Sequence, residues 1–475
     1  MENVVSRLER VLNPRTLAVV GDKQASGYMW LKNMKPFTGT LYSVQIDPKE
    51  IPGIEALGVT NVKSLMDIPE DVDLVVCAVP RNVAPYVVAD CVKKRVGGVA
   101  MFTSGFAETG EELGVKLQEA ITQTARENDL LIVGPNCMGI YNPRVGVRFS
   151  NEQPAGEAGN VGFISQSGTH GINVSLLAAA NGLKLSKVVS IGNSIVLDAS
   201  DYLEYFTADP ETEVIGLYVE GVKDGRRFFR TLKAAAARKP VVVWKGGRTA
   251  AGARATQSHT ASLATGQRIW DALVAQAGAV QAQNLDETVD LLQMLRRAKP
   301  GTGTRVGLMA MTGGQSVVLT DAFESAGLEV PLMSETSYAE LATFFNVIGG
   351  SYRNPFDMGG TIGGDQENLD RLFRILDADP NIDAIAMEIS ATFMSRRWAN
   401  HPEQLEEFIQ RLARHRDAST KPFLTIMHPG HAEIEVANQR PRLQAAGLPV
   451  LPSFDRAAKA LRLCVDYHTF RAEIG

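Results

Sequence analysis

The chain has 475 residues, of which 45% are hydrophobic and 21% are charged, and its formal net charge is −5 at pH 7. This length predicts about three domains of ordinary size, and the composition is that of a water-soluble globular protein. The acidic balance argues against general nucleic-acid binding, no apolar run is long enough for a membrane span, and the N-terminal residues lack the apolar stretch of a signal peptide. We therefore expect a cytoplasmic protein that binds neither nucleic acid nor membrane.

The first third of the chain alternates short apolar runs with amphipathic segments. Strands are predicted at 16–21, 41–46, 73–80, 98–106 and 130–136, and helices at 82–95 and 110–128. Nearly continuous apolar strands separated by helices indicate a parallel sheet that is covered on both faces. Residues 1–147 are therefore predicted to form a doubly wound, Rossmann-like α/β domain.

The same alternation restarts twice. The second series of strands is predicted at 159–165, 186–193, 214–220 and 239–247, with helices around 266–278 and 286–297; the third is predicted at 305–314, 384–390, 422–427 and 448–452. We expect an α/β protein with three doubly wound parallel-sheet domains at 1–147, 155–298 and 303–475, the last two flavodoxin-like.

Cysteines and histidines give no metal-binding pattern. Cys77, Cys91, Cys137 and Cys464 show no C-x-x-C spacing, so reduced thiols are expected rather than a disulfide frame. The pair in H-P-G-H (428–431) is separated by Pro-Gly, which favours a turn. No metal site is predicted.

Several strands run into turns that are rich in glycine and hydroxyl residues, where parallel α/β sheets bind ligands and helix N-termini attract anions. The stretch I-S-Q-S-G-T-H-G (164–171) suits either an ordinary helix cap or a phosphate cradle, and the pattern leaves both open. The turn V-V-G-D-K-Q-A-S-G (19–27) lacks G-x-G-x-x-G. Asp22 would disfavour a phosphate beside it, and Lys23 could offset that effect.

His259 lies in T-Q-S-H-T-A-S-L-A-T (256–265), among small and hydroxyl side chains. Taken alone, this stretch favours an ordinary loop histidine over a reactive one.

Seven stretches, in one order along the chain, resemble the NDP-forming acyl-CoA synthetases, the relatives of succinyl-CoA synthetase. They are S-G-F-A-E-T-G (104–110), G-P-N-C-M-G-I-Y-N-P (134–143), G-N-V-G-F-I-S-Q-S-G (159–168), S-I-G-N (190–193), L-Y-V-E-G-V-K-D-G-R-R-F (217–228), K-G-G-R…S-H-T-A-S-L-A (245–264) and N-P-F-D (354–357). The resemblance implies a ligase that joins a carboxylic acid to coenzyme A through a phosphohistidine and an acyl phosphate.

The resemblance also implies roles for the matched positions. His259 would be phosphorylated, on a mobile loop at 246–266, and Glu220 would orient it, since a carboxylate on one imidazole nitrogen fixes the tautomer; without the resemblance, Glu220 would be a surface residue at a strand end. The phosphohistidine would rest on Ser165, Ser167, Gly168 and Thr169, with Asn193 as a further contact. Coenzyme A would be held by the first domain, at Gly21, Lys23, Gly27, Pro80, Ser104, Gly105 and Asn136.

The family also needs an ATP-grasp module, which binds ATP/ADP with Mg²⁺, and we find no candidate for it in this sequence. The resemblance therefore implies an α-type subunit that works with a separate ATP-grasp β subunit in a hetero-oligomer, and a homodimer of this chain stays open. His170 stands where relatives usually have a small or apolar residue, so it could contact the acyl substrate or the phosphate. The turn M-T-G-G-Q-S (311–316) also departs from the family's pattern.

Three other hypotheses remain: a CoA-binding regulatory protein, an ATP-independent acyl or carbamoyl transferase on the same fold, and a nicotinamide-dependent oxidoreductase. His259 and Glu220 argue against the regulatory protein, because a binder needs neither. The absence of G-x-G-x-x-G argues against the oxidoreductase. The residues identify neither the acid nor the choice between ATP and GTP.

Overall fold

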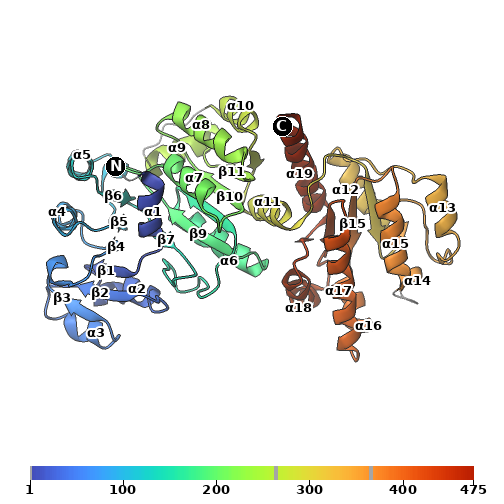
Figure 1. Cartoon of the computed structure of the whole chain (residues 1–475), viewed down its shortest axis with the longest axis horizontal. Coiled ribbons are helices and arrows are strands. Elements are labelled where there is room, and N and C mark those ends of the chain that lie inside the picture. The colour runs from blue at the N-terminus through green and yellow to red at the C-terminus, as the bar shows by residue number, and fades with distance from the viewer. Residues whose placement is uncertain (1–2, 261–265, 363–366, 475) are drawn as a thin grey trace. The chain divides into compact units, whose positions relative to one another are not determined.

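The computed structural model describes residues 3–260, 266–362 and 367–474, without the side chains of 257–260 and 474 (Figure 1). The chain divides into two compact units. The first comprises Met1–Ala179 and Lys184–Thr288, and the second comprises Ala180–Leu183 and Val289–Gly475. The first unit contains two sheets and the second contains one.

The first sheet has six parallel strands in the order β3-β2-β1-β4-β5-β6. The strands are β1 (Thr16–Val20), β2 (Thr40–Val44), β3 (Thr60–Val62), β4 (Leu74–Cys77), β5 (Gly98–Met101) and β6 (Leu131–Val133). The helices of this domain are α1 (Val4–Leu12), α2 (Met29–Asn33), α3 (Ile51–Glu55), α4 (Ala84–Lys94) and α5 (Glu112–Glu127). The strand order reverses between β1 and β4, and a ligand crevice is expected at that point in such sheets.

The second sheet has the order β12-β11-β10-β8-β9-β7. Its strands are β7 (Gly139–Tyr141), β8 (Val161–Ser165), β9 (Leu185–Ser190), β10 (Val214–Val219), β11 (Val241–Lys245) and β12 (Val280–Ala282). Its helices are α6 (Gly168–Ala180), α7 (Ala199–Ala208), α8 (Gly225–Ala236), α9 (Ala250–Thr260), α10 (Gln267–Ala277) and α11 (Leu285–Arg297). All pairings are parallel except that of β7 with β9.

The two sheets of the first unit are joined by helix packing and by polar contacts between side chains and backbone of the two domains. Helix α1 packs against α7, where the hydroxyl of Tyr205 donates to the carboxylate of Glu9 at 2.6 Å. The side-chain amide of Asn142 donates to the Leu12 carbonyl at 2.8 Å. These contacts hold both sheets within one compact unit.

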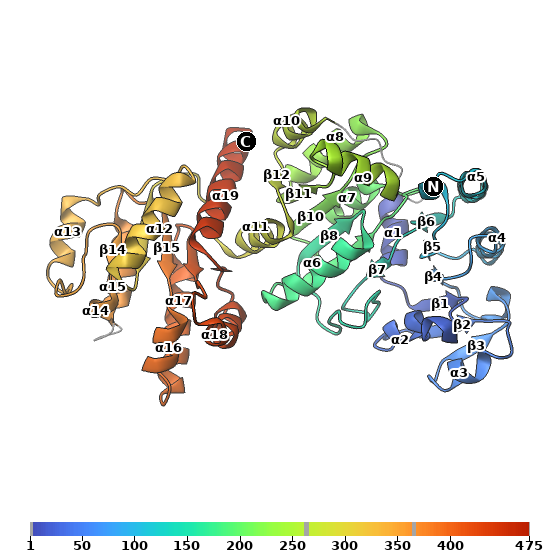
Figure 2. The same cartoon turned by 180° about the vertical axis from the view of Figure 1, so that it is seen from behind.

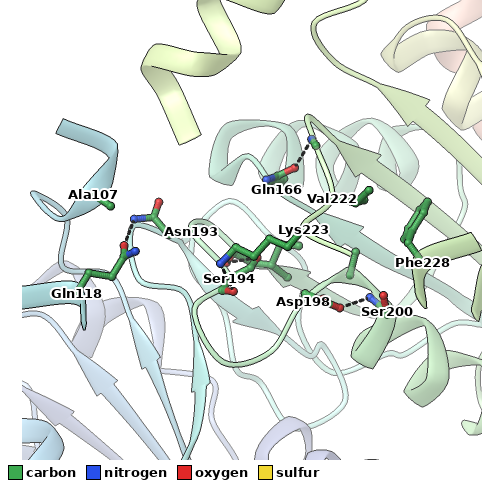
Figure 3. A pocket seen from close by; sticks show the side chains of 13 residues that line it. Ala107, Gln118, Gln166, Asn193, Ser194, Asp198, Ser200, Val222, Lys223 and Phe228 are labelled. Carbon is green, nitrogen blue, oxygen red and sulfur yellow. Dashed lines mark hydrogen bonds between the residues drawn. The ribbon is translucent and has the colours of Figure 1, made fainter. Parts of the chain in front are cut away.

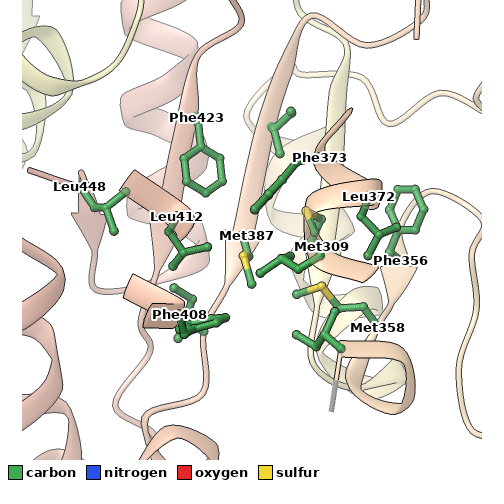
Figure 4. Close-up of a cluster of buried hydrophobic side chains, with 14 of the residues drawn as sticks. Met309, Phe356, Met358, Leu372, Phe373, Met387, Phe408, Leu412, Phe423 and Leu448 are labelled. Atoms are coloured by element: carbon green, nitrogen blue, oxygen red, sulfur yellow. The ribbon is translucent and has the colours of Figure 1, made fainter. Parts of the chain in front are cut away.

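The third sheet, in the second unit, has five parallel strands in the order β14-β13-β15-β16-β17. They are β13 (Val306–Ala310), β14 (Phe356–Asp357), β15 (Ala384–Glu388), β16 (Phe423–Ile426) and β17 (Val450–Leu451). The helices around it are α12 (Gly313–Ser325), α13 (Glu335–Leu341), α14 (Gly359–Ile362), α15 (Glu367–Ala378), α16 (Ala391–Arg397), α17 (Pro402–Ala418), α18 (Glu433–Ala445) and α19 (Phe454–Ile474). Strand residues such as Met309 and Met387 meet helix residues such as Phe373 and Phe408 in one buried cluster (Figure 4).

The prediction of three parallel-sheet α/β domains is confirmed, and Figure 2 shows the same elements from behind. Four short strands were not predicted, namely β3, β7, β12 and β14; each has only two or three residues, too few for a periodic pattern. The four cysteines are free and buried. Among the described residues, no helix combines the length and the apolar character that a membrane-crossing segment requires.

Candidate functional site

The turn between β8 and α6 carries four of the predicted phosphate-binding residues. Ser165 is fully buried, and its hydroxyl donates to the Ser167 carbonyl at 2.6 Å. The hydroxyl of Ser167 accepts the backbone N–H of His170 at 3.4 Å, as a helix cap does. Gly168 begins the helix and Thr169 is exposed in its first turn. The cap is therefore present, and Thr169 stands at a helix N-terminus that faces solvent.

Glu220 follows the last residue of β10 and is only 4% exposed, so the interpretation as a surface glutamate is wrong. The hydroxyl of Tyr218 donates to its carboxylate at 3.1 Å. The side-chain oxygen of Gln166 accepts the backbone N–H groups of Glu220 and Gly221 at 2.6 and 3.1 Å, and the ammonium of Lys245 donates to the Glu220 carbonyl at 2.6 Å. Glu220 is thus held from three neighbouring strand ends.

The two side chains that bond Glu220 from β10 and β11 are themselves buried. The pKa of Tyr218 is raised, first by burial and then by the charge of Glu220, so its hydroxyl remains a donor. Burial lowers the pKa of Lys245, whose ammonium lies 5.5 Å from the centre of the Trp270 ring. Sequence reasoning missed Tyr218, Gln166 and Lys245 as supports of Glu220.

His170 packs in an aromatic cluster beside this network. The centre of its ring lies 4.4 Å from that of Tyr218 and 4.5 Å from that of Trp244, and the Tyr218 and Trp244 rings are also 4.5 Å apart. The bulky partners explain why the first turn of α6 carries a histidine here, because an imidazole can fill the space over two aromatic rings.

The segment around His259 is a helix up to Thr260, so the expectation of a loop throughout 246–266 is wrong for α9. Alanine-rich sequence has high helix propensity, which explains the difference. Helix α9 begins shortly after β11 and packs against the short helical turn Ala107–Thr109 of the first domain. His259 lies in the last turn of α9, its side chain lies outside the described residues, and its role stays a prediction.

Asn193 and Asn136, predicted for two different ligands, lie together. The Asn193 amide donates to Glu108 at 2.6 Å and to Gln118 at 3.0 Å, and its oxygen accepts from the Asn136 amide at 3.3 Å. The turn after β9 is therefore bonded to the loops after β5 and β6 (the Asn193–Gln118 bond is drawn in Figure 3).

A pocket of about 370 Å³ lies at the carboxyl ends of β1, β2 and β4, where the strand order reverses. Gly21, Lys23 and Pro80 line it, three of the residues predicted to hold coenzyme A. Gly21 has φ +87°, and a Cβ there would lie 2.4 Å from Val79, so the turn needs glycine. The carboxylate of Asp22 points inward instead, accepting the Leu31 N–H at 2.9 Å while the residue is 1% exposed.

The other four predicted residues lie outside the lining of this pocket. Gly27 ends the short helical turn after β1. Ser104 and Gly105 follow β5, where the Gly105 carbonyl accepts from Arg81 at 2.8 Å. Asn136 bonds Asn193, as described above. The structure therefore brings together only part of the predicted coenzyme A set. Among the described residues, no three His, Cys, Asp or Glu side chains are grouped so as to hold a metal ion.

Comparison with known proteins places these features in a family. A CoA binding domain model matches residues 15–143, and a succinyl-CoA ligase like flavodoxin domain model matches residues 158–295. The chain is 33% identical to the alpha subunit of acetate–CoA ligase [ADP-forming] I of Pyrococcus furiosus, over 98% of this chain and 99% of that one. It is 35% identical to acetate–CoA ligase [ADP-forming] I of Archaeoglobus fulgidus over 81% of this chain, and the match spans 55% of that longer protein.

A solved structure gives the same result. The dinucleotide forming acetyl-coenzyme A synthetase 1 of Ca. Korarchaeum cryptofilum, in complex with phosphate and ADP, superposes with a TM-score of 0.81 at 28% identity, covering 98% of both chains. The order of the domains, the two matched family models and the 33% identity over nearly the full length of the chain all indicate the same family. The chain therefore belongs to the family of ADP-forming acid–thiol ligases, the acyl-CoA synthetases that include these acetate–CoA ligases.

Proposed function

We propose that this chain is the α-type subunit of an ADP-forming acyl-CoA synthetase, which forms its thioester through a phosphohistidine at His259. The observation that carries the proposal is the fixed position of Glu220, bonded from Tyr218, Gln166 and Lys245 at the end of the second sheet. Gln166 and Lys245 hold the backbone of Glu220 and Tyr218 bonds its buried carboxylate, and a carboxylate placed in this way suits the orientation of an imidazole.

In the proposed reaction, the imidazole of His259 carries a phosphoryl group. A carboxylate oxygen of the acid attacks the phosphorus, the N–P bond breaks and an acyl phosphate forms. The thiol of coenzyme A loses its proton and attacks the acyl carbon, the C–O bond breaks and inorganic phosphate leaves. The exposed Thr169 and the N-terminus of α6 would stabilise the phosphoryl oxygens.

The pocket of the first domain suits coenzyme A. Lys23 and Lys63 line it and can meet phosphate groups, and Ile46 and Tyr86 line it although each is 73% exposed, so they offer apolar faces to a ligand. Coenzyme A supplies the thiol when bound. The chain's own contribution is to hold it beside the loops after β5 and β6, which bond the turn after β9 through Asn193.

ATP and Mg²⁺ would bind to an ATP-grasp β subunit, in a hetero-oligomer. Two observations support a second chain: the full-length Pyrococcus furiosus relative is an alpha subunit, and the Archaeoglobus fulgidus relative is nearly twice as long as its matched part. The purified chain should then make no acyl-CoA from ATP, acid and coenzyme A, and turnover by the chain alone would overturn the two-chain proposal.

The phosphohistidine is tested in the reverse direction, which needs no second chain. The purified chain is incubated with inorganic phosphate and either acetyl-CoA, isobutyryl-CoA or phenylacetyl-CoA, and its intact mass is measured. We expect an acid-labile gain of about 80 Da, the mass of one phosphoryl group.

His259→Ala should abolish the adduct, while His401→Ala, an exposed histidine of the second unit, should retain it. A chain that binds coenzyme A but never gains the adduct would favour a regulatory protein instead. Acyl exchange between thiols without an adduct would favour an ATP-independent transferase on the same fold.

A further inference from the structure

The pocket at the ends of β1, β2 and β4 has an acidic turn that the coenzyme A prediction does not use. Strand β2 runs into V-Q-I-D-P (44–48), and both Ile46 and Asp47 line the pocket. In doubly wound folds, a carboxylate after the second strand bonds the hydroxyl groups of an adenosine ribose, whereas a ribose phosphate is met by a cation there. The residues at the end of β2 therefore indicate which kind of ribose the pocket accepts.

Asp47 is held in place by the turn that carries it. Its backbone N–H donates to the side-chain oxygen of Gln45 at 3.1 Å, and one of its carboxylate oxygens accepts the Lys49 N–H at 3.0 Å. A carboxylate has about four acceptor sites, so Asp47 keeps acceptor capacity for a ligand. Because its side chain is exposed and lines the pocket, the hydroxyl groups of a ribose can reach it.

The charged groups around the pocket include more carboxylates than ammonium groups. Among the described residues that line it, the carboxylates belong to Asp47, Glu50 and Asp90, and the ammonium groups belong to Lys23 and Lys63. Lys23 lies in the turn after β1, where the pyrophosphate of an adenine dinucleotide binds in such folds. Lys63 follows β3 and is thus the lysine nearer in topology to the end of β2.

The negative charge of Glu50 is fixed beside the pocket. Its carboxylate accepts the Gln24 N–H at 2.7 Å and the Tyr28 hydroxyl at 2.9 Å, which joins the turns after β1 and β2. The charge of Asp90 is already paired with Lys93 at 3.1 Å. A phosphate on the ribose would therefore meet the carboxylates after β2 with a single lysine, the one after β3, to oppose them.

An apolar wall next to this turn suits an adenine ring. Ile46 directly precedes Asp47, and Tyr86 lies on α4; each side chain is 73% exposed although it lines the pocket. Exposed apolar and aromatic faces around a pocket favour a flat aromatic ligand group. An adenine that packs on Ile46 has its ribose beside Asp47, because the two residues are neighbours in the chain.

We propose that this pocket also binds adenosine 5′-diphosphate esters whose ribose carries no phosphate, such as NAD⁺ and dephospho-coenzyme A, with the ribose hydroxyl groups on Asp47, and that these nucleotides compete with coenzyme A. Coenzyme A carries a 3′-phosphate on the same ribose, and Asp47 and Glu50 face that phosphate with like charge. The inference rests on the proposed function only in taking this pocket as the coenzyme A site, and it is independent of the phosphohistidine.

Isothermal titration calorimetry of the full chain gives the Kd values of coenzyme A, dephospho-coenzyme A, NAD⁺ and NADP⁺. Within each pair the two nucleotides differ by one ribose phosphate, and the comparison of dephospho-coenzyme A with NAD⁺ isolates the contribution of the pantetheine arm. We expect dephospho-coenzyme A to bind at least as tightly as coenzyme A. NAD⁺ should bind at least about tenfold more tightly than NADP⁺, since like charges weaken binding and a hydrogen bond to a carboxylate is lost. Added NAD⁺ should raise the apparent Kd of coenzyme A.

Asp47→Asn separates the charge from the turn. The asparagine oxygen can still accept the Lys49 N–H, so the turn is kept while the negative charge is removed. Both Kd ratios should shift roughly tenfold toward the nucleotide with the ribose phosphate. Glu119→Gln is the matched control, because it removes an exposed carboxylate of α5 that lies outside the lining of this pocket, and it should leave both ratios unchanged.

Dephospho-coenzyme A that binds more than about tenfold more weakly than coenzyme A would overturn the inference, while the pocket would remain the coenzyme A site. Ratios that are equal in the wild type and Asp47→Asn would overturn it as well, and so would a chain that binds none of the four nucleotides. If NAD⁺ binds and competes as expected while no adduct forms on His259, the inference stands and the phosphohistidine proposal fails.

Discussion

Tyr218→Phe is the sharpest test of the network around Glu220. The substitution removes one hydroxyl and leaves the ring, so the packing of Tyr218 against His170 and Trp244 is kept. The deleted hydrogen bond runs from a neutral hydroxyl to a buried carboxylate over 3.1 Å. Bonds to charged groups contribute about 1.5–3 kcal/mol, and this one is longer than the 2.5–2.7 Å typical of its class.

The lower half of that range therefore applies, about 1.5–2 kcal/mol, which corresponds to a roughly 10- to 30-fold slower loading of phosphate. The assay is the rate of adduct formation from acyl-CoA and phosphate, measured by intact mass after rapid quenching. If Tyr218 acts by positioning Glu220, the maximal loading rate should fall while the KM for acyl-CoA stays the same.

Tyr202→Phe is the matched control. Tyr202 is fully buried on α7, and its hydroxyl bonds no partner among the described residues. The Tyr202→Phe variant should therefore load phosphate at the wild-type rate. Loading of Tyr218→Phe within twofold of wild type would refute the reasoning, and so would an equal loss in both variants.

Three further predictions concern stability, measured by urea unfolding of the full chain. Burial raises the pKa of Glu388 to about 7, so the protonated side chain contributes to the free energy of unfolding below the pKa that Glu388 has in the unfolded chain, and this contribution is lost as the pH rises through 7. Between pH 4 and pH 8, the free energy of unfolding of Glu388→Gln should therefore rise by up to about 3 kcal/mol relative to that of the wild type. A difference between the two proteins that does not change with pH would contradict this. Gly192→Ala places a Cβ 2.2 Å from the Pro135 carbonyl at φ +48°, which should cost about 2 kcal/mol or more, whereas Gly225→Ala meets nothing within 4 Å and should change stability by less than about 0.5 kcal/mol; equal effects would contradict the steric argument. Lys187→Met removes a 1% exposed ammonium that lies 3.1 Å from Asp209 and leaves the buried carboxylate without this partner. The free energy of unfolding should fall by about 3–5 kcal/mol. A decrease below about 1 kcal/mol would contradict this prediction.

Much of the fold was predictable because buried parallel strands are continuous apolar runs. Thr16–Val20 and Val241–Lys245 are such runs, and the structure places strands there. Strand Gly139–Tyr141 carries no such signal, because its identity comes only from antiparallel pairing with β9. Helix α9 was missed because a resemblance to a mobile loop outweighed its alanine-rich composition.

The features of the candidate site were also only partly predictable from the sequence. Glu220 could be named from a motif at a strand end, but its burial depends on three chain segments that meet only in the folded sheet. Asn193 shows contacts that the sequence did not predict. The resemblance implied a phosphate contact for this residue, which stays a prediction, and the structure adds that its amide is bonded to Glu108 and Gln118 of the first domain.

The sequence by itself determined the class of fold, the order of the domains and the family, because apolar periodicity and short motifs are local properties of the chain. Only the tertiary structure decided which side chains meet. In the folded chain the carboxylate of Asp22 points inward, away from the pocket at the ends of β1, β2 and β4, and the turn after β9 is hydrogen-bonded to the first domain. A cavity that Lys223 and Phe228 line also exists only in the folded chain. Cavities and hydrogen bonds between distant residues depend on distances that no local pattern encodes, since they arise when strand ends from separate βα units converge.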